Sequence, residues 1–254
     1  MKGFTHRAVG SVLAIAMLTV MTASASAFSP PEVGRCVKVA AKTGHFTSSS
    51  CIKESTVKAP GSYEWLPGAV KNKFKTTGGV GTLATVGGTT VTCKTQESGG
   101  EFNSPKTVTG VTVRFTSCEA TGFKCATEGA KEGEIVTNPL EGRIGIENKE
   151  KKKVALDLFP TAEDGGLYVT FNCGASLHIT VGGSVLVNVL SDKMVSTLTL
   201  KYTSSKGHQK PEHFEGEPND VLITEINGKK PEQSGITITS TQTGEEPLEA
   251  NAVF

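Results

Sequence analysis

The sequence predicts an all-β protein, either an antiparallel β-barrel or a β-sandwich of about 10–13 short strands stapled by disulfides. Threonine alternates with apolar residues along much of the chain, which is typical of strands with one face in a core. Gly, Pro, Asn and Asp separate these runs, and helical periodicity is hard to find. An even set of six cysteines favours covalent cross-links.

The N-terminus predicts export. Two positively charged residues precede the apolar run 8–21, and small residues follow it, with Ala25 and Ala27 in the pattern of a cleavage site. The run is shorter than the roughly 20 apolar residues that a membrane-spanning helix needs. Residues 1–27 are therefore expected to be a signal peptide that is removed after Ala27.

The cysteines all lie downstream of this leader, so we expect three disulfides formed in an oxidising compartment. Neither a C-x-x-C pair nor a His beside a Cys pair occurs, which argues against a zinc site. Six cysteines allow fifteen pairings, and the sequence alone does not choose among them. Short loops favour the pairs Cys36–Cys51 and Cys118–Cys125. This leaves Cys93 to pair with Cys173.

The clearest strand prediction is a hairpin over 82–86 and 89–93, with Gly87 and Gly88 as a two-residue turn of positive φ. Residues 184–190 are apolar on both faces, which predicts a central strand covered on both sides. The other expected strands are 108–115, 134–137, 143–147, 154–159, 168–173, 176–181, 195–203, 221–226, 235–241 and 248–253.

The composition suggests two regions after the leader. Residues 76–254 show no break and are expected to form one all-β domain. Residues 28–75 are less regular and richer in proline, so we expect an N-terminal arm that packs on this domain and is stapled by Cys36 and Cys51.

Two places carry candidate binding contacts. Tyr63 and Trp65 form the one aromatic cluster, for which a plug at the edge of the core is the favoured interpretation over a contact with a ligand. His208 and His213 lie in the long polar loop 204–220, where a metal site is conceivable but solvated side chains are favoured.

Several function classes are poorly supported. Twenty-six Lys and Arg against 25 Asp and Glu give a net charge of +1, so no field exists to hold nucleic acid. One Trp and three Tyr cannot supply the aromatic girdles of a membrane barrel, so no integral membrane association is expected. No G-x-S-x-G or phosphate-binding loop occurs, and we predict no catalytic, cofactor-binding or metal-binding residue.

Some short patterns are shared with other exported proteins. These patterns are Gly61-x-Tyr63-x-Trp65-x-Pro67-Gly68, Val91-x-Cys93, the Cys118–Cys125 loop followed by Gly133-x-Ile135-x-Thr137-x-x-Leu140-x-Gly142, and Phe171-x-Cys173-Gly174. With the leader, the chain resembles uncharacterised secreted cysteine-containing β-proteins of actinobacterial type. The resemblance implies export and a cysteine-stapled β fold, and it carries over no activity.

The leading hypothesis from the sequence is a secreted, non-enzymatic binding or structural module at or outside the cell envelope. The sequence does not identify its partner, and the candidates are a cell-envelope component and a small apolar ligand. The first alternative is a β-barrel carrier of a small apolar ligand. The second is a secreted hydrolase whose catalytic residues form no recognisable motif.

Overall fold

The structure is a computed structural model that describes residues 31–189 and 191–251. The predicted signal peptide, residues 1–27, lies outside this range. Within it the chain forms nineteen strands and one short 3₁₀ helix, Ala162–Asp164, and every ladder is antiparallel. The predicted all-β class is confirmed, and the architecture is a closed barrel.

The strands of the described residues are β1 (Glu32–Lys38), β2 (Tyr63–Pro67), β3 (Lys73–Gly78), β4 (Gly81–Thr85), β5 (Thr90–Cys93), β6 (Thr95–Phe102), β7 (Thr107–Thr116), β8 (Glu119–Ala120), β9 (Phe123–Ala126), β10 (Ile135–Val136), β11 (Leu140–Asn148), β12 (Lys153–Pro160), β13 (Leu167–Cys173), β14 (Leu177–Gly182), β15 (Val185–Asn188), β16 (Ser191–Ser205), β17 (His208–Lys210), β18 (Leu222–Ile226) and β19 (Glu232–Asn251).

Eight strands close into a ring at one end of the molecule. The pairing runs from β4 through β5, β8, β9, β13, β14, β18 and β19 and returns to β4. Closure leaves no free sheet edge around this ring, and that protects it from pairing with other chains.

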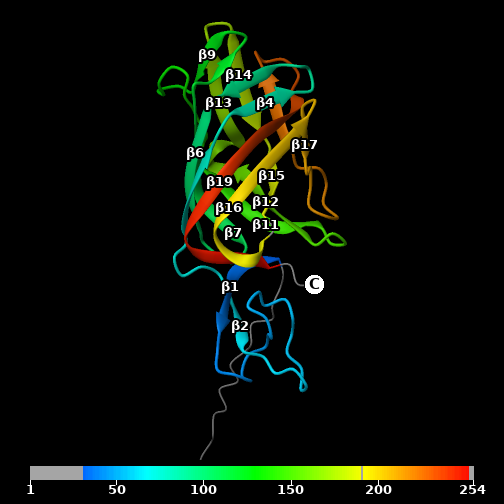
Figure 1. Cartoon of the computed structure of the whole chain (residues 1–254). Coiled ribbons are helices and arrows are strands. Elements are labelled where there is room, and N and C mark those ends of the chain that lie inside the picture. The colour runs from blue at the N-terminus through cyan, green and yellow to red at the C-terminus, as the bar shows by residue number, and fades with distance from the viewer. Residues whose placement is uncertain (1–30, 190, 252–254) are drawn as a thin grey trace, which may run out of the picture.

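A second stretch of sheet continues below the ring. There β16, β19, β3, β6, β7, β11, β12 and β15 pair in that order. In Figure 1 the long strands β16 and β19 cross the front of the barrel side by side, and β1 and β2 lie beneath it. The structure has more strands than predicted, because seven of them lie where the sequence predicts none: β1, β2, β3, β6, β8, β9 and β17.

β19 is one strand where the sequence predicts two, 235–241 and 248–253. Between Thr243 and Leu248 its pairing with β16 shifts register, because Thr197 faces Thr243 and Val195 faces Leu248. Pro247 falls inside this bulge, where the missing N–H of proline breaks no ladder bond. The residues after Asn251 lie outside the described chain.

One apolar core fills both stretches of sheet. Alternate residues of the strands point into it, and the largest side chains fully buried there are Phe171, Leu140, Ile179, Val108, Val154 and Val187. A separate small cluster, Ala155, Leu186 and Phe214, lies on the outer face. It covers the outer face of β15, so this strand is covered on both sides as predicted. The prediction that the strand is central is wrong, because among the described residues β15 forms a ladder with β12 alone.

The N-terminal residues join the barrel through β1, which pairs with β2 and with the end of β19. Cys36, Phe46, Cys51 and Trp65 form a core of their own, with Met194 of the barrel packed against it. β3 begins at Lys73 and already pairs with β6 and β19. The division into an arm, 28–75, and a domain, 76–254, stays a prediction.

The expected hairpin of β4 and β5 is present, but its turn differs from the expectation. Ala84 faces Thr90, and the N–H of Gly88 donates to the carbonyl oxygen of Thr85. Only Gly88 of the two glycines has positive φ, 93°. The turn is therefore longer than the predicted two-residue turn.

The disulfides confirm one predicted pair and correct two. Cys36 pairs with Cys51, but Cys93 pairs with Cys118 and Cys125 with Cys173. The predicted pairs Cys118–Cys125 and Cys93–Cys173 are wrong, because proximity here follows the ladders and not the shortest loop. β5 meets β8, which sets Cys93 opposite Cys118, and Cys125 directly faces Cys173.

We expect the stabilisation by each disulfide to follow the length of chain that it closes. The chain-entropy relation gives about 3 kcal/mol for Cys36–Cys51 and about 4 kcal/mol for Cys125–Cys173, whose separations are 15 and 48 residues. Urea unfolding of the two paired Cys→Ala variants would measure the losses. An equal or smaller loss for Cys125→Ala/Cys173→Ala would contradict the expectation.

Candidate functional site

The strongest candidate site is a cavity of about 110 Å³ inside the barrel. Every second residue of several strands reaches it, as with Val111, Val113 and Phe115 of β7. This spacing is the direct result of strand geometry, because alternate side chains point to the same face. The walls therefore come from both the closed ring and the sheet below it.

β19 forms the spine of the cavity. Ile236, Ile238, Ser240 and Gln242 alternate along its inner face and all border the space. The wall changes along this strand from isoleucine to serine and glutamine. The strand thus contributes an apolar section and a polar section to one cavity.

The polar section contains a defined hydrogen bond. Ser240 Oγ donates to Gln96 Oε1 over 2.9 Å, and both residues are buried. At Gly78 any Cβ would lie 2.7 Å from each of these two oxygens, so the absence of a side chain there leaves room for the pair. The amide nitrogen of Gln96 donates no hydrogen bond within the described residues.

Two tyrosines, Tyr168 and Tyr202, also border the cavity. Burial raises the pKa of Tyr168 well above its usual value, and electrostatic repulsion from the ionised forms of Tyr202 and Asp157 adds to this. Burial also raises the pKa of Tyr202. Both phenols stay neutral at ordinary pH, so no charge develops on these rings at the cavity wall.

A second cavity of about 60 Å³ lies further along β19, and Leu156 and Gln242 border both spaces. Cavities of drug-binding size measure roughly 300–1,000 Å³. An apolar cavity of roughly 150 Å³ accommodates a benzene molecule. The interior thus suits a compact molecule and excludes a long acyl chain or a folded cofactor.

A larger depression of about 540 Å³ lies on the outside of β3, β6 and β7. Backbone at Gly99, Gly110 and Gly244 forms much of it, with Lys73 and Lys75 along its side. It offers few converging side chains of fixed geometry. The interior cavity is therefore the better-defined site.

A polar network holds the loop after β17 against the outer face. Arg143 of β11 lies 3.3 Å from Asp157 and 2.7 Å from Glu217, with Asp220 at 4.0 Å. Its guanidinium also lies 5.0 Å from the centroid of the Phe214 ring, within cation–π range. At Gly145 a Cβ would lie 2.7 Å from that ring, so glycine makes room for Phe214.

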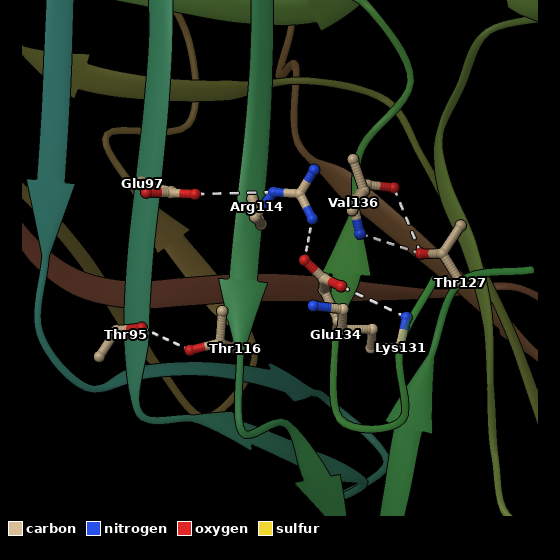
Figure 2. Close-up of polar contacts among 8 residues, drawn as sticks. All are labelled: Thr95, Glu97, Arg114, Thr116, Thr127, Lys131, Glu134 and Val136. Carbon is tan, nitrogen blue, oxygen red and sulfur yellow. Dashed lines mark hydrogen bonds and ion pairs between the residues drawn. The ribbon is translucent and has the colours of Figure 1, made fainter. Parts of the chain in front are cut away.

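Figure 2 shows a second outer-face network, which fixes the segment between β9 and β10. Arg114 of β7 forms ion pairs with Glu97 and Glu134, while Thr127 Oγ1 bonds both the N–H and the carbonyl of Val136. Cys118 donates its N–H to the carbonyl oxygen of Gly133 in the same segment. These contacts support the wall beside the Cys93–Cys118 disulfide and present no reactive group.

The aromatic residues predicted as binding contacts lie outside the barrel cavity. Trp65 is buried in the N-terminal cluster, where its Nε1 donates to Glu32 Oε1 over 2.6 Å. Tyr63 is half-buried two residues earlier on β2 and packs against the same cluster. The favoured interpretation of a core plug describes this geometry, since the indole has little surface left for a ligand.

The two histidines predicted as candidate contacts are exposed. His208 Nδ1 lies 3.7 Å from Glu212 Oε1, and His213 is in the following loop. Among the residues that the structure describes, no group of three His, Cys, Asp or Glu side chains has the arrangement of a metal site. The structure thus gives these histidines no converging ligand set.

The hydrolase alternative finds no support in the contacts. In the described part of the chain, the histidine rings bond Glu64 and Asn172, and none bonds a serine hydroxyl. Asp157 has a raised pKa, but its side chain is completely buried beneath Arg143 and the loop. A carboxyl group in that position does not reach a substrate.

Gln96 and Ser240 were not predicted as candidate site residues. The signal was present for Ser240 and Gln242, because they continue the alternation of Ile236 and Ile238. Polar residues on a face that is otherwise apolar mark either a buried hydrogen bond or a ligand contact.

Asp157 predicts a pH dependence of stability. Burial, with the nearby charge of Asp220, raises its pKa to about 6, while Arg143 opposes the rise. Because an unfolded aspartate titrates near 3.9, the native state holds the proton more tightly. The contribution of Asp157 is therefore fully present below about pH 4 and is lost as the pH rises through about 6.

The free energy of unfolding of wild type relative to Asp157→Asn should fall by about 2–3 kcal/mol between pH 4 and pH 8. Urea titrations at several pH values measure it. Asp220→Asn is the control, since removing its charge should move the midpoint of this change to lower pH. A difference that does not vary with pH would show that Asp157 titrates normally.

Comparison of the chain with protein-family models, curated proteins and solved structures found no match. Among the described residues, no helix has the length and apolar character needed to cross a membrane. Any functional conclusion therefore rests on the geometry of the chain itself.

Proposed function

We propose that the chain acts outside the cytoplasm, at or beyond the cell envelope, as a non-enzymatic binding or structural module. The observation that carries the proposal is the set of three disulfides in an all-β barrel. Such bonds persist in oxidising compartments and are rare in reducing ones. The signal peptide predicted over residues 1–27 and the resemblance to secreted actinobacterial proteins point the same way.

The positions of the cysteines support a permanent structural role for these bonds. Cys51, Cys118, Cys125 and Cys173 have no exposed surface, and Cys36 and Cys93 are also buried. Reactive or regulatory cysteines are usually accessible. The buried disulfides thus support a fold that is stable in an oxidising compartment, where no reducing system keeps cysteines as thiols.

A second candidate function, the carriage of a small apolar ligand, is favoured by one observation. The barrel interior contains a cavity with largely apolar walls and a small polar section. Small β-barrels in other proteins hold single small ligands in this position. In this form the binding role belongs to the interior, whereas an envelope partner would contact the outside.

Export makes a direct prediction about the protein in the cell. Mass spectrometry of culture medium, envelope and cytoplasmic fractions should find most of the chain outside the cytoplasm, beginning at Phe28. Peptides isolated without reduction should contain the linked pairs Cys36–Cys51, Cys93–Cys118 and Cys125–Cys173. A cytoplasmic chain that retains Met1 and has alkylatable thiols would overturn the proposal.

A further inference from the structure

We propose that the interior cavity is a binding site for a compact molecule of about one aromatic ring that carries a single hydroxyl group, the chemical class of phenol. The inference gives the binding role proposed above a ligand class and rests on it. It depends on three features of the cavity, namely its volume, its walls and its polar pair.

The volume limits the ligand to about the size of one aromatic ring. A space of about 110 Å³ approaches the size that holds benzene in an apolar protein cavity. The adjoining space of about 60 Å³ shares Leu156 and Gln242 in its wall and is itself too small for a second ring. A fatty acid or a sugar therefore does not fit.

The walls favour an aromatic molecule over water. Phe74, Phe115, Phe171, Tyr168 and Tyr202 contribute rings, and valine, leucine and isoleucine side chains complete most of the lining. Water enters a cavity stably only where it finds several polar partners. Aromatic rings also attract one another in edge-to-face and offset arrangements, which favours a ring-shaped occupant.

The polar pair supplies the hydrogen bond that selects a hydroxyl group. Ser240 uses its proton on Gln96 Oε1, so its oxygen remains able to accept a proton from a ligand. The Gln96 amide nitrogen makes no bond to the described residues and is able to donate to the same ligand oxygen. A single hydroxyl thus satisfies one acceptor and one donor in a space with mostly apolar walls. Apart from the two tyrosines, the other polar residues that border it are Thr76, Thr82, Ser98, Thr137 and Gln242.

The test uses the full mature chain with its disulfides intact and phenol as the probe, with benzene as the comparison. Phenol should bind with a dissociation constant below about 1 mM, measured by calorimetry. In methyl NMR spectra, phenol should shift the signals of Val113 and Val185, which border the cavity. The signal of Val108, which is buried in the same core but lines neither cavity, should move less.

Variants separate the volume from the polar pair. Filling the space with Val113→Leu and Val185→Leu should weaken phenol binding at least 10-fold, whereas the matched control Val108→Leu should leave it within twofold. Ser240→Ala and Gln96→Leu should weaken phenol about 10-fold and benzene much less. Thermal unfolding of each variant checks that it folds.

Two outcomes would overturn the inference. Either the wild-type methyl signals do not respond to phenol, or phenol binds the filled variant as well as the wild type. The methyl measurement needs no variant, so the inference stays testable even if the filled variant does not fold. Because the export test reads location and thiol state, failure of the proposed function is distinguishable from failure of this ligand class.

Discussion

The continuity of β19 is the constraint on which the rest of the structure depends. This strand pairs with β18 and β4 in the closed ring, with β16 and β3 below it, and with β1 at its end. One strand therefore holds both stretches of sheet in a fixed relation. Its alternation places Ile236 and Ile238 inside and Thr237 and Thr239 on the other face, so the same pattern that forms the strand also builds the cavity wall.

Barrel closure in turn determines the disulfides. Cys125 donates its N–H to the carbonyl oxygen of Cys118, so the two bonded pairs lie in one row across β5, β8, β9 and β13. The row crosses the part of the ring where strands are shortest, since β8 has two residues and β9 has four. Short ladders contribute few hydrogen bonds, and covalent links therefore stabilise the ring where the backbone pairing is weakest.

The sequence predicted what depends on local pattern and missed what depends on neighbours. Alternation of threonine with apolar residues located most of the strands from β10 onward, and the apolar faces of β15 were recognised because each residue carries its own signal. This alternation missed short or less regular strands such as β1, β8 and β9. The pairing of Cys93 with Cys118 was not predictable, because it requires knowing that β5 lies beside β8. The same holds for the site, since Ser240 signals an inward polar residue but its partner Gln96 is 144 positions away. Which distant strands pair is a property of the closed ring, and a short stretch of sequence does not show it.

An interior cavity lowers the stability of the fold, and in this barrel the disulfides offset the loss. At about 24 cal/mol per Å³, a void of about 110 Å³ lowers stability by roughly 2–3 kcal/mol. One disulfide of the kind seen here offsets that amount, at about 3–4 kcal/mol. A ligand present at a hundred times its dissociation constant would also return about 2.7 kcal/mol. The disulfides therefore allow the barrel to fold with an open cavity, and binding of a ligand in that cavity would restore the stability that the cavity costs.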